Sequence, residues 1–213
     1  MLQISLLEKS YLNKCILKEL SLTIEKPGLY GIVGANGVGK TTFFKCLSGL
    51  ETYQGTILYN GQPLFSDEVA FFPTEPFLYD HLTVEEFYTF FSKLLEIPLS
   101  KKYAFEIDKK LLIRQLSTGI RKKVYYNALL QKPYTLYIFD EPFNGLDISS
   151  VLHIKRLILS LAQTHIVFVA SHLLETLQHC QCIYLLQNSV FQNFTPEEID
   201  IIEELLIKSN TEK

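Results

Sequence analysis

The stretch GANGVGKTT at 34–42 constrains the fold of this chain most strongly. The apolar run LYGIV at 29–33 lies directly before it and is typical of a strand buried on both faces. A segment of helical period lies directly after it, beginning near Gly39 and ending at Gly49. A strand, a glycine-rich loop and a helix in immediate succession are typical of α/β proteins with a mainly parallel sheet.

Other segments extend this α/β prediction along the chain. The apolar runs TLYIFD at 135–140 and HIVFVA at 165–170 predict two more buried strands. Shorter, more alternating segments predict an antiparallel β portion beside the main sheet, at 2–7, 20–25 and 56–59. Further helices are predicted after polar capping residues, namely Thr83 with Glu86, Ser117, Ser149 or Ser150, and Thr195 with Glu198.

The length and composition favour one globular domain over residues 1–213. With 47% hydrophobic and 20% charged residues, the chain is too apolar and too weakly charged to be mainly disordered. Residues 77–116 lack strand signals, so they predict a small helical subdomain inserted into the α/β core.

Several features bear on the compartment and the partners. No apolar run approaches the roughly 18 residues that a membrane-spanning helix needs, and the start MLQISLLEKS lacks the basic residues of an export signal. We therefore expect a cytosolic chain. The net charge of −3 argues against nucleic acid as a partner, and the basic residues 121–123 are interpreted as a solvated helix face.

The four cysteines predict ordinary reduced thiols. Cys15, Cys46, Cys180 and Cys182 lack the CxxC spacing of zinc and redox sites. His179 with Cys180 and Cys182 offers a second, weaker hypothesis of a metal site, because no second pair of ligands is evident.

The glycine-rich stretch also carries chemistry, because it fits the phosphate-binding pattern GxxxxGK[ST]. Gly34, Gly39, Lys40 and Thr41 occupy the fixed positions, and Gly37 is an additional glycine. Glycines let backbone N–H groups curl around an anion, and the following helix adds the partial positive charge of its N-terminus. Lys40 is expected to reach the β- and γ-phosphates of a nucleotide, and the Thr41 hydroxyl to help hold Mg²⁺.

A second cluster of candidate site residues lies in YIFDEP at 137–142. A strand that ends in carboxylates places them at the edge of a parallel sheet where ligands bind. Asp140 is expected to assist Mg²⁺ and Glu141 to accept a proton from an attacking water. Taken alone, the two acids fit a solvated pair before a turn equally well.

With LSTGIRKKV at 116–124 and the pair Ser171–His172, these motifs resemble the ATP-binding-cassette (ABC) family, specifically the nucleotide-binding subunit of a transporter. The order of the motifs matches along the whole chain. Residues 34–42 resemble the Walker A loop, 116–119 the family signature, 137–141 the Walker B strand and 144–147 the D-loop. His172 resembles the switch histidine, and Tyr11 resembles the aromatic residue that stacks on adenine.

The resemblance implies an ATPase that uses ATP and Mg²⁺, with Glu141 and His172 as catalytic residues and with Thr41 and Asp140 at the metal. It implies that two cassettes, as a homodimer or a heterodimer, enclose ATP head to tail and drive a separate membrane-spanning transporter subunit from the inner face of the cell membrane. The implied nucleotide-binding residues are Tyr11, Asn36, Gly37, Gly39, Lys40, Thr41, Thr42, Ser117 and Gly119, the last two acting on the nucleotide of the opposing cassette.

The chain departs from the family pattern at three positions. Thr74 stands where the family has the glutamine of the Q-loop, and Thr118 and Ile120 replace a glycine and the glutamine of the signature. A threonine is too short both to sense the metal or water and to contact a membrane partner, so we expect Thr74 to affect hydrolysis or coupling. The aromatic residues of 71–91 are expected to be mostly core, with an exposed subset forming a docking patch.

Two other functions fit the same motifs. One is a soluble cassette protein acting on nucleic acid or ribosomes, although the chain has neither a second cassette nor a coiled-coil insertion. The other is a nucleotide-gated module with weak hydrolysis, which Thr74 motivates.

Overall fold

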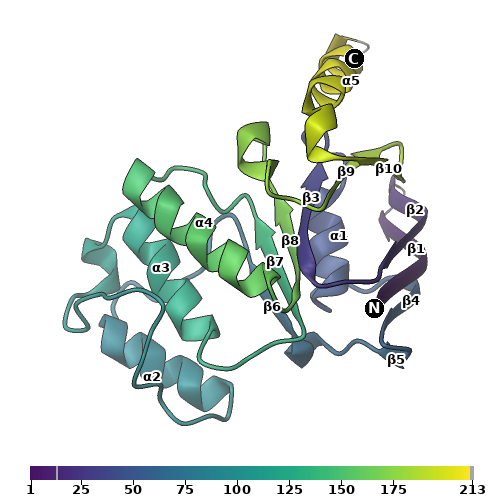
Figure 1. Cartoon of the computed structure of the whole chain (residues 1–213). Helices are drawn as coiled ribbons and strands as arrows, with labels where there is room; N and C mark the ends of the chain where they lie inside the picture. Colours follow the sequence, from purple (N-terminus) through teal and green to yellow (C-terminus); the bar gives the residue numbers. More distant parts are fainter. Residues whose placement is uncertain (13, 212–213) are drawn as a thin grey trace.

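The computed structural model describes residues 1–12 and 14–211 (Figure 1). Its strands form two sheets. The larger, six-stranded sheet has the order β10-β9-β3-β8-β7-β6 and contains β3 (Gly28–Val33), β6 (Val69–Phe72), β7 (Leu136–Asp140), β8 (Ile166–Ala170), β9 (Cys182–Gln187) and β10 (Val190–Phe194). The smaller sheet has the order β2-β1-β4-β5 and contains β1 (Leu2–Tyr11), β2 (Lys14–Ile24), β4 (Gln54–Tyr59) and β5 (Gln62–Pro63).

The pairing of the strands confirms the predicted fold class. Every neighbouring pair from β9 to β6 is parallel, and only β10 joins the edge of this sheet in the antiparallel direction. The smaller sheet is antiparallel throughout, as the alternating segments predicted. The protein is therefore an α/β protein with a mainly parallel sheet and a separate antiparallel portion.

The two faces of the six-stranded sheet pack in different cores. In β8, Phe168 faces a cluster that includes α1 (Lys40–Leu47) and the smaller sheet, whereas Val167 and Val169 face a cluster that includes α4 (Ile148–Ala162). Because successive strand residues point to opposite faces, a strand that is buried on both faces must be apolar throughout. This is why the three apolar runs at 29–33, 135–140 and 165–170 were recognisable as strands. Figure 1 shows α1 between the two sheets and α4 on the opposite face.

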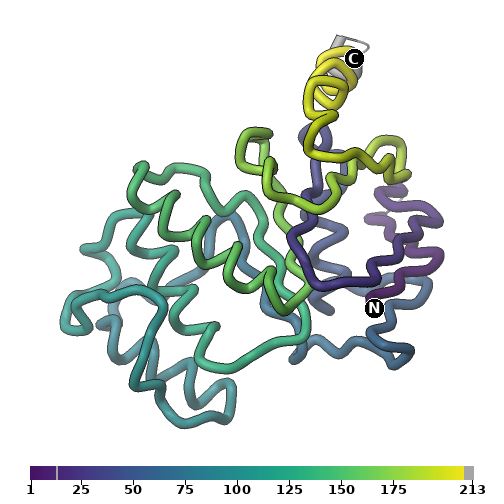
Figure 2. The backbone as a smooth tube through the Cα atoms, in the orientation of Figure 1, coloured from purple at the N-terminus to yellow at the C-terminus, as the bar shows by residue number. Residues whose placement is uncertain are grey.

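A helical part lies between β6 and β7, and Figure 2 shows the chain leaving the sheet and returning to it there. It contains α2 (Val84–Leu94), the capping box of Thr83 and Glu86, and α3 (Thr118–Leu129) with Ser117 as its N-cap. A separate hydrophobic cluster joins the two helices, with Phe87 and Val124 fully buried. The division into one domain with a helical subdomain at about 77–116 stays a prediction.

The structure corrects some details of the sequence-based expectations. Helix α4 begins at Ile148, not after Ser149 or Ser150, because the side chain of Asp147 accepts a hydrogen bond from the Ser150 N–H and caps the helix. Strands β6, β9 and β10 were not predicted. The last helix, α5 (Ile199–Thr211), follows the predicted capping box of Thr195 and Glu198 and projects from the body (Figure 1).

Within 1–12 and 14–211, the structure contains no helix with the length and apolar character required to cross a bilayer.

Candidate active site

The candidate site lies where three parallel strands end side by side. In the sheet, β8 lies between β3 and β7, and its last residue, Ala170, pairs with Ile32 of β3 and Asp140 of β7. The loop after β3 therefore meets the residues that follow β7 and β8. This is the edge of a parallel sheet at which ligands bind.

The glycine-rich loop passes directly from β3 into α1. Gly39 is the N-cap of α1 and has φ of 116°, a conformation that residues with a Cβ rarely adopt. No side chain caps the N-terminus of α1, so the first backbone N–H groups of this helix face the loop. The loop therefore presents backbone donors and the positive end of a helix to an anion.

A cavity of about 200 Å³ lies over this loop. It collects most of the residues that the sequence predicted for the site. Its lining is Ile16, Asn36, Gly37, Gly39, Lys40, Thr41, Thr42, Asp140, Glu141 and His172. The predicted phosphate, metal and catalytic residues of 36–42, 140, 141 and 172 thus lie around one space.

Lys40 is buried at the base of the cavity. Its ammonium donates hydrogen bonds to the backbone carbonyls of Gly34, at 2.7 Å, and Ala35, at 3.3 Å. Burial lowers the pKa of Lys40, and the nearby carboxylates of Glu141 and Asp140 oppose this shift. A buried cation beside backbone donors forms a strongly attractive site for phosphate oxygens.

Thr41 and Asp140 form the second part of the site. The Thr41 hydroxyl donates a 2.7 Å hydrogen bond to Oδ2 of Asp140, whose side chain is buried. Burial raises the pKa of Asp140, and the Thr41 hydroxyl and the Lys40 ammonium lower it. These two hard oxygen ligands suit Mg²⁺, which proteins commonly bind through one or two side chains together with substrate phosphates. Among the described residues, no group of three or more His, Cys, Asp and Glu side chains is placed to hold a metal.

Glu141 and His172 form the third part. Oε2 of Glu141 accepts a 3.2 Å hydrogen bond from the backbone N–H of His172. Its Oε1 lies 3.1 Å from Nε2 of the His172 ring, but without hydrogen-bond geometry, so this buried oxygen accepts no hydrogen bond within the part of the chain described. A buried acceptor without a donor is costly, and a water molecule next to it would supply that donor. The arrangement fits a carboxylate that binds and deprotonates water.

The signature residues lie outside this cavity. Ser117 is exposed at the start of α3, and its hydroxyl accepts a hydrogen bond from the Ile120 N–H at 3.4 Å. Gly119 is buried, and a Cβ there would lie 3.0 Å from the Ser150 hydroxyl at the start of α4. A side chain at position 119 would therefore be crowded against α4, a packing constraint that the sequence did not reveal.

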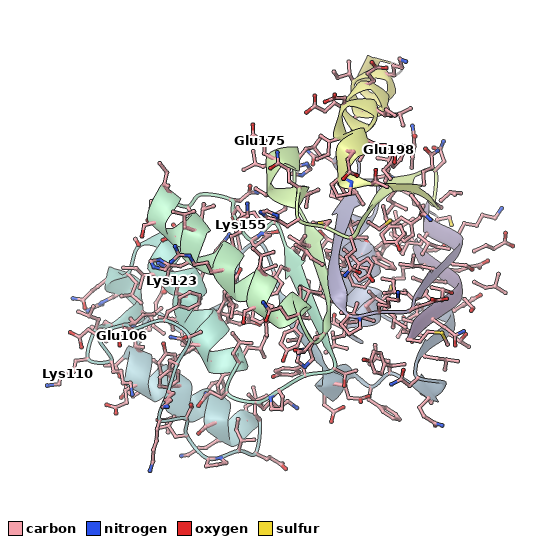
Figure 3. The ribbon with its side chains drawn as sticks, viewed as in Figure 1. Glu106, Lys110, Lys123, Lys155, Glu175 and Glu198 are labelled. Atoms are coloured by element: carbon pink, nitrogen blue, oxygen red, sulfur yellow. The ribbon has the colours of Figure 1, made fainter. Side chains whose placement is uncertain are left out.

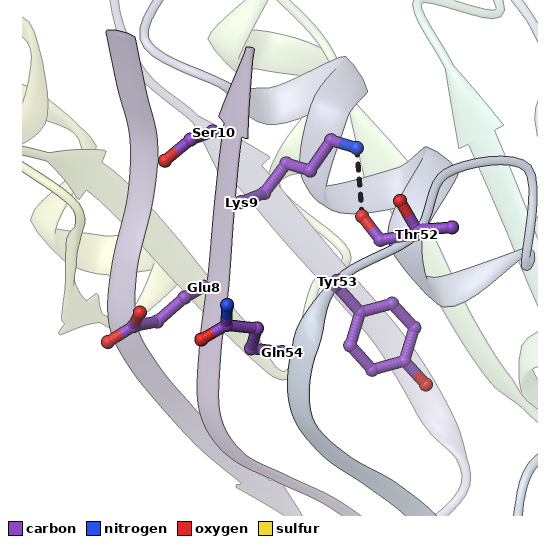
Figure 4. A pocket seen from close by; sticks show the side chains of 6 residues that line it. All are labelled: Glu8, Lys9, Ser10, Thr52, Tyr53 and Gln54. Atoms are coloured by element: carbon purple, nitrogen blue, oxygen red, sulfur yellow. Dashed lines mark hydrogen bonds between the residues drawn. The ribbon is translucent and has the colours of Figure 1, made fainter. Parts of the chain in front are cut away.

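Tyr11 lies at the end of β1, beside a cluster of polar residues. The Lys9 ammonium is 4.8 Å from the centroid of the Tyr11 ring, 2.9 Å from Glu51 and 2.8 Å from the carbonyl of Thr52. Figure 4 shows the hydrogen bond from Lys9 to Thr52 in a neighbouring cavity of about 250 Å³. Burial raises the pKa of Tyr11, and Glu51 adds to this shift. One face of the ring is thus covered by a cation.

The interpretation of residues 121–123 as a solvated face is wrong for Lys122. This side chain is only 2% exposed, and its ammonium donates to backbone carbonyls after β7. Arg121 is paired with Asp80 at 2.7 Å. A run of basic residues gives no sequence signal that separates a buried lysine from an exposed one, because its long aliphatic stem suits both environments.

The cysteines lie apart from the site. Burial raises the pKa of Cys46 to about 11 and that of Cys180 to about 12, which keeps both thiols protonated at neutral pH. Cys182 begins β9, which lies between β10 and β3, and Cys15 is exposed in β2.

Comparisons with known proteins agree with this geometry. A sequence profile described as ABC transporter matches residues 17–144. The SkfA peptide export ATP-binding protein SkfE of Bacillus subtilis is 32% identical over 171 residues, which cover 70% of this chain and 69% of the relative. The lantibiotic transport ATP-binding protein SrtF of Streptococcus pyogenes is 29% identical over 191 residues, which cover 84% and 83%.

The fold also has solved counterparts. A structure described as the ATP binding subunit of an ABC transporter superposes with a TM-score of 0.81 at 24% identity, over 96% of this chain and 94% of that one. The fold and the site define a P-loop nucleotide-binding protein. The family match makes the class specific: the chain belongs to the ABC transporter family, as an ATP-binding subunit of the kind that powers transport with membrane partners.

Proposed function

We propose that the chain binds ATP with Mg²⁺ in the cavity at residues 36–42 and hydrolyses it. The observation that carries the proposal is the convergence of Lys40, the Thr41–Asp140 pair and the Glu141–His172 pair around one space. Backbone donors and Lys40 hold the β- and γ-phosphates, and Tyr11 stacks on adenine. Thr41 and Asp140 would hold Mg²⁺, and the bound metal would supply positive charge next to the phosphate oxygens.

Glu141 performs the proton transfer in this proposal. Its Oε1 orients a water molecule and takes a proton from it while the water oxygen attacks the γ-phosphorus and the bond to the β-phosphate oxygen breaks. Inorganic phosphate and ADP are the products. His172 holds the carboxylate through its N–H at 3.2 Å, so that Oε1 faces the water. Lys40 balances the charge that accumulates on the transferred group.

The proposed active form is a head-to-tail dimer of cassettes, of two copies of this chain or of this chain and another. The exposure of Ser117 supports it, because a signature that lies outside its own cavity is free to act on the nucleotide of an opposing cassette. The N-terminus of α3 also places the positive end of a helix dipole next to the γ-phosphate of the opposing cassette. ATP joins the two surfaces, whereas ADP lacks the group that the second surface binds.

A membrane-spanning subunit is the proposed transport partner, which places the chain at the inner face of the membrane. An apolar cavity of about 560 Å³ on the helical part supports this. Large aromatic side chains around it are unusually exposed: Phe77 by 75%, Tyr79 by 45% and Phe90 by 39%. Two related proteins carry peptide export or lantibiotic transport in their names, which makes export of a peptide a reasonable activity for the assembled transporter.

Removal of the metal tests the proposed reaction. The purified protein is expected to release phosphate from ATP with Mg²⁺ present, and excess EDTA is expected to lower the rate at least about 100-fold, since a bound metal contributes several kcal/mol to the transition state. The measurement is steady-state phosphate release, with restored Mg²⁺ as the control. ATP binding without hydrolysis at any Mg²⁺ concentration would leave the chain a nucleotide-gated module.

Thr74→Gln tests the departure from the family pattern. The longer side chain restores an amide that reaches a water or metal, so we expect kcat to rise by up to about tenfold, or hydrolysis to respond more strongly to the transport partner. ATPase activity is measured for the subunit alone and for the complex isolated from membranes. Thr74→Val, which keeps the size and removes the hydroxyl, is the control. If the glutamine changes neither quantity, other residues already compensate for Thr74.

A further inference from the structure

Lys122 is a buried cation that has no role in the proposed reaction. Its side chain is 2% exposed, and the hydrogen bonds of its ammonium go to backbone carbonyls of one short loop: Glu141 at 3.3 Å, Pro142 at 3.4 Å and Asn144 at 3.0 Å. Burial lowers the pKa of Lys122, and the carboxylates of Glu141 and Glu75 oppose this. A buried charge is costly unless it is well bonded, so these three carbonyls are the contacts that hold the ammonium there.

The loop that Lys122 contacts has an unfavourable backbone. Glu141 has φ of 50°, in the left-handed region that residues with a Cβ rarely adopt. Such a conformation persists only when its surroundings hold it. The Glu141 N–H donates to the Ala170 carbonyl at 3.0 Å, which ties one side of the residue to β8. The Lys122 ammonium holds the carbonyl of the same residue and those of Pro142 and Asn144.

Lys122 also joins two regions that are distant in sequence. It lies on α3, five residues after Ser117, and it reaches the loop 141–147, which leads from β7 into α4. The helix that presents the signature serine and the loop that carries Glu141 are thus connected through one side chain.

We propose that Lys122 is a positioning residue: its bonds to the carbonyls of 141, 142 and 144 hold the strained loop so that the Glu141 carboxylate stays aimed into the nucleotide cavity. This inference rests on the proposed role of Glu141. Lys122 is not among the residues that line the nucleotide cavity, so its removal is expected to affect the rate of hydrolysis and not the affinity for ATP.

The test compares Lys122→Met, which keeps most of the aliphatic stem, with Lys122→Gln, which keeps a neutral donor. We expect Lys122→Met to lower kcat about 10- to 100-fold, because a misplacement of about 1 Å costs up to about 100-fold, while KM for ATP changes less than about twofold. Lys122→Gln is expected to lie between it and the wild type. Amide hydrogen exchange within 141–147 is expected to accelerate about tenfold in Lys122→Met, without a matching change in β3.

The control is Lys123→Met, the same substitution one position further along α3. Its ammonium lies over the Phe105 ring at 5.8 Å, and Figure 3 shows this residue on the helical side of the molecule. For Lys123→Met we expect the kcat and the amide hydrogen exchange of the wild type.

Wild-type kcat and exchange in a folded Lys122→Met protein would overturn the proposal, and so would an acceleration of exchange spread evenly over α3, β7 and β3. If Lys122→Met does not fold, Lys122→Gln is held to the same two measurements. A wild-type protein that hydrolyses no ATP contradicts the role of Glu141, whereas the exchange data still decide whether Lys122 holds the loop.

Discussion

Glu141→Gln is expected to slow ATP hydrolysis about 10²- to 10⁴-fold, the usual contribution of a general base. An amide has nearly the same shape as the carboxylate, and its oxygen still accepts the hydrogen bond from the backbone N–H of His172, but it does not take a proton from water. The mutated position lies beside the phosphate loop and not within it, so ATP affinity is expected to stay within about twofold of the wild type. Because ATP is then bound but not consumed, the proposed dimer accumulates.

Two measurements check this expectation. Phosphate release gives the rate, and size-exclusion chromatography with ATP, with ADP and without nucleotide gives the oligomeric state. Glu203→Gln, an exposed position on α5, carries the same chemical change far from the site and is expected to behave as the wild type. Unchanged turnover in Glu141→Gln shows that another group takes the proton. Loss of ATP binding shows instead that the carboxylate supports the phosphate loop.

The sequence predicted the centre of the fold because its strands are apolar on both faces. β3, β7 and β8 read as continuous apolar runs, and their order in the sheet brings residues 40, 140 and 172 together. Two of the missed strands, β6 and β10, have weaker signals, whereas β9 is an apolar run with four consecutive buried residues, like the strands that the sequence did predict. β6 is only four residues long, and β10 is an edge strand whose side chains are all half-buried or exposed.

The sequence predicted the site most completely for residues that are recognised by their residue type and their position in a motif. Lys40, Thr41 and Asp140 have fixed positions in a motif, and the structure places all three around one cavity. Tertiary contacts were not predictable in the same way. That Gly119 packs against Ser150, and that Lys122 crosses to the loop after β7, depends on how α3 meets α4, which no local pattern of residues specifies.

Lys40→Ala is expected to weaken ATP binding about 10- to 150-fold, because a charge-assisted hydrogen bond contributes about 1.5–3 kcal/mol. In the structure the ammonium bonds to the carbonyls of Gly34 and Ala35, at the base of the cavity that the phosphates would enter. Burial lowers its pKa, and a bound phosphate would stabilise the charged form. The loss of affinity is therefore expected to grow with the number of phosphates, and AMP is expected to bind both proteins about equally.

Calorimetric titration with ATP, ADP and AMP, in the presence of Mg²⁺, measures this dependence. Lys155→Ala, on α4 and on the helical side of the molecule (Figure 3), removes a lysine of the same size and is expected to leave all three affinities unchanged. An equal loss for ATP and AMP would mean that Lys40 supports the fold of residues 34–39 and does not bind phosphate, because only a contact with the outer phosphates distinguishes these ligands. If Lys40→Ala bound ATP as tightly as the wild type, the basis for placing the triphosphate in this cavity would be removed. Without Lys40, the remaining donors are backbone N–H groups and uncharged hydroxyls, which bind an anion without a full positive charge.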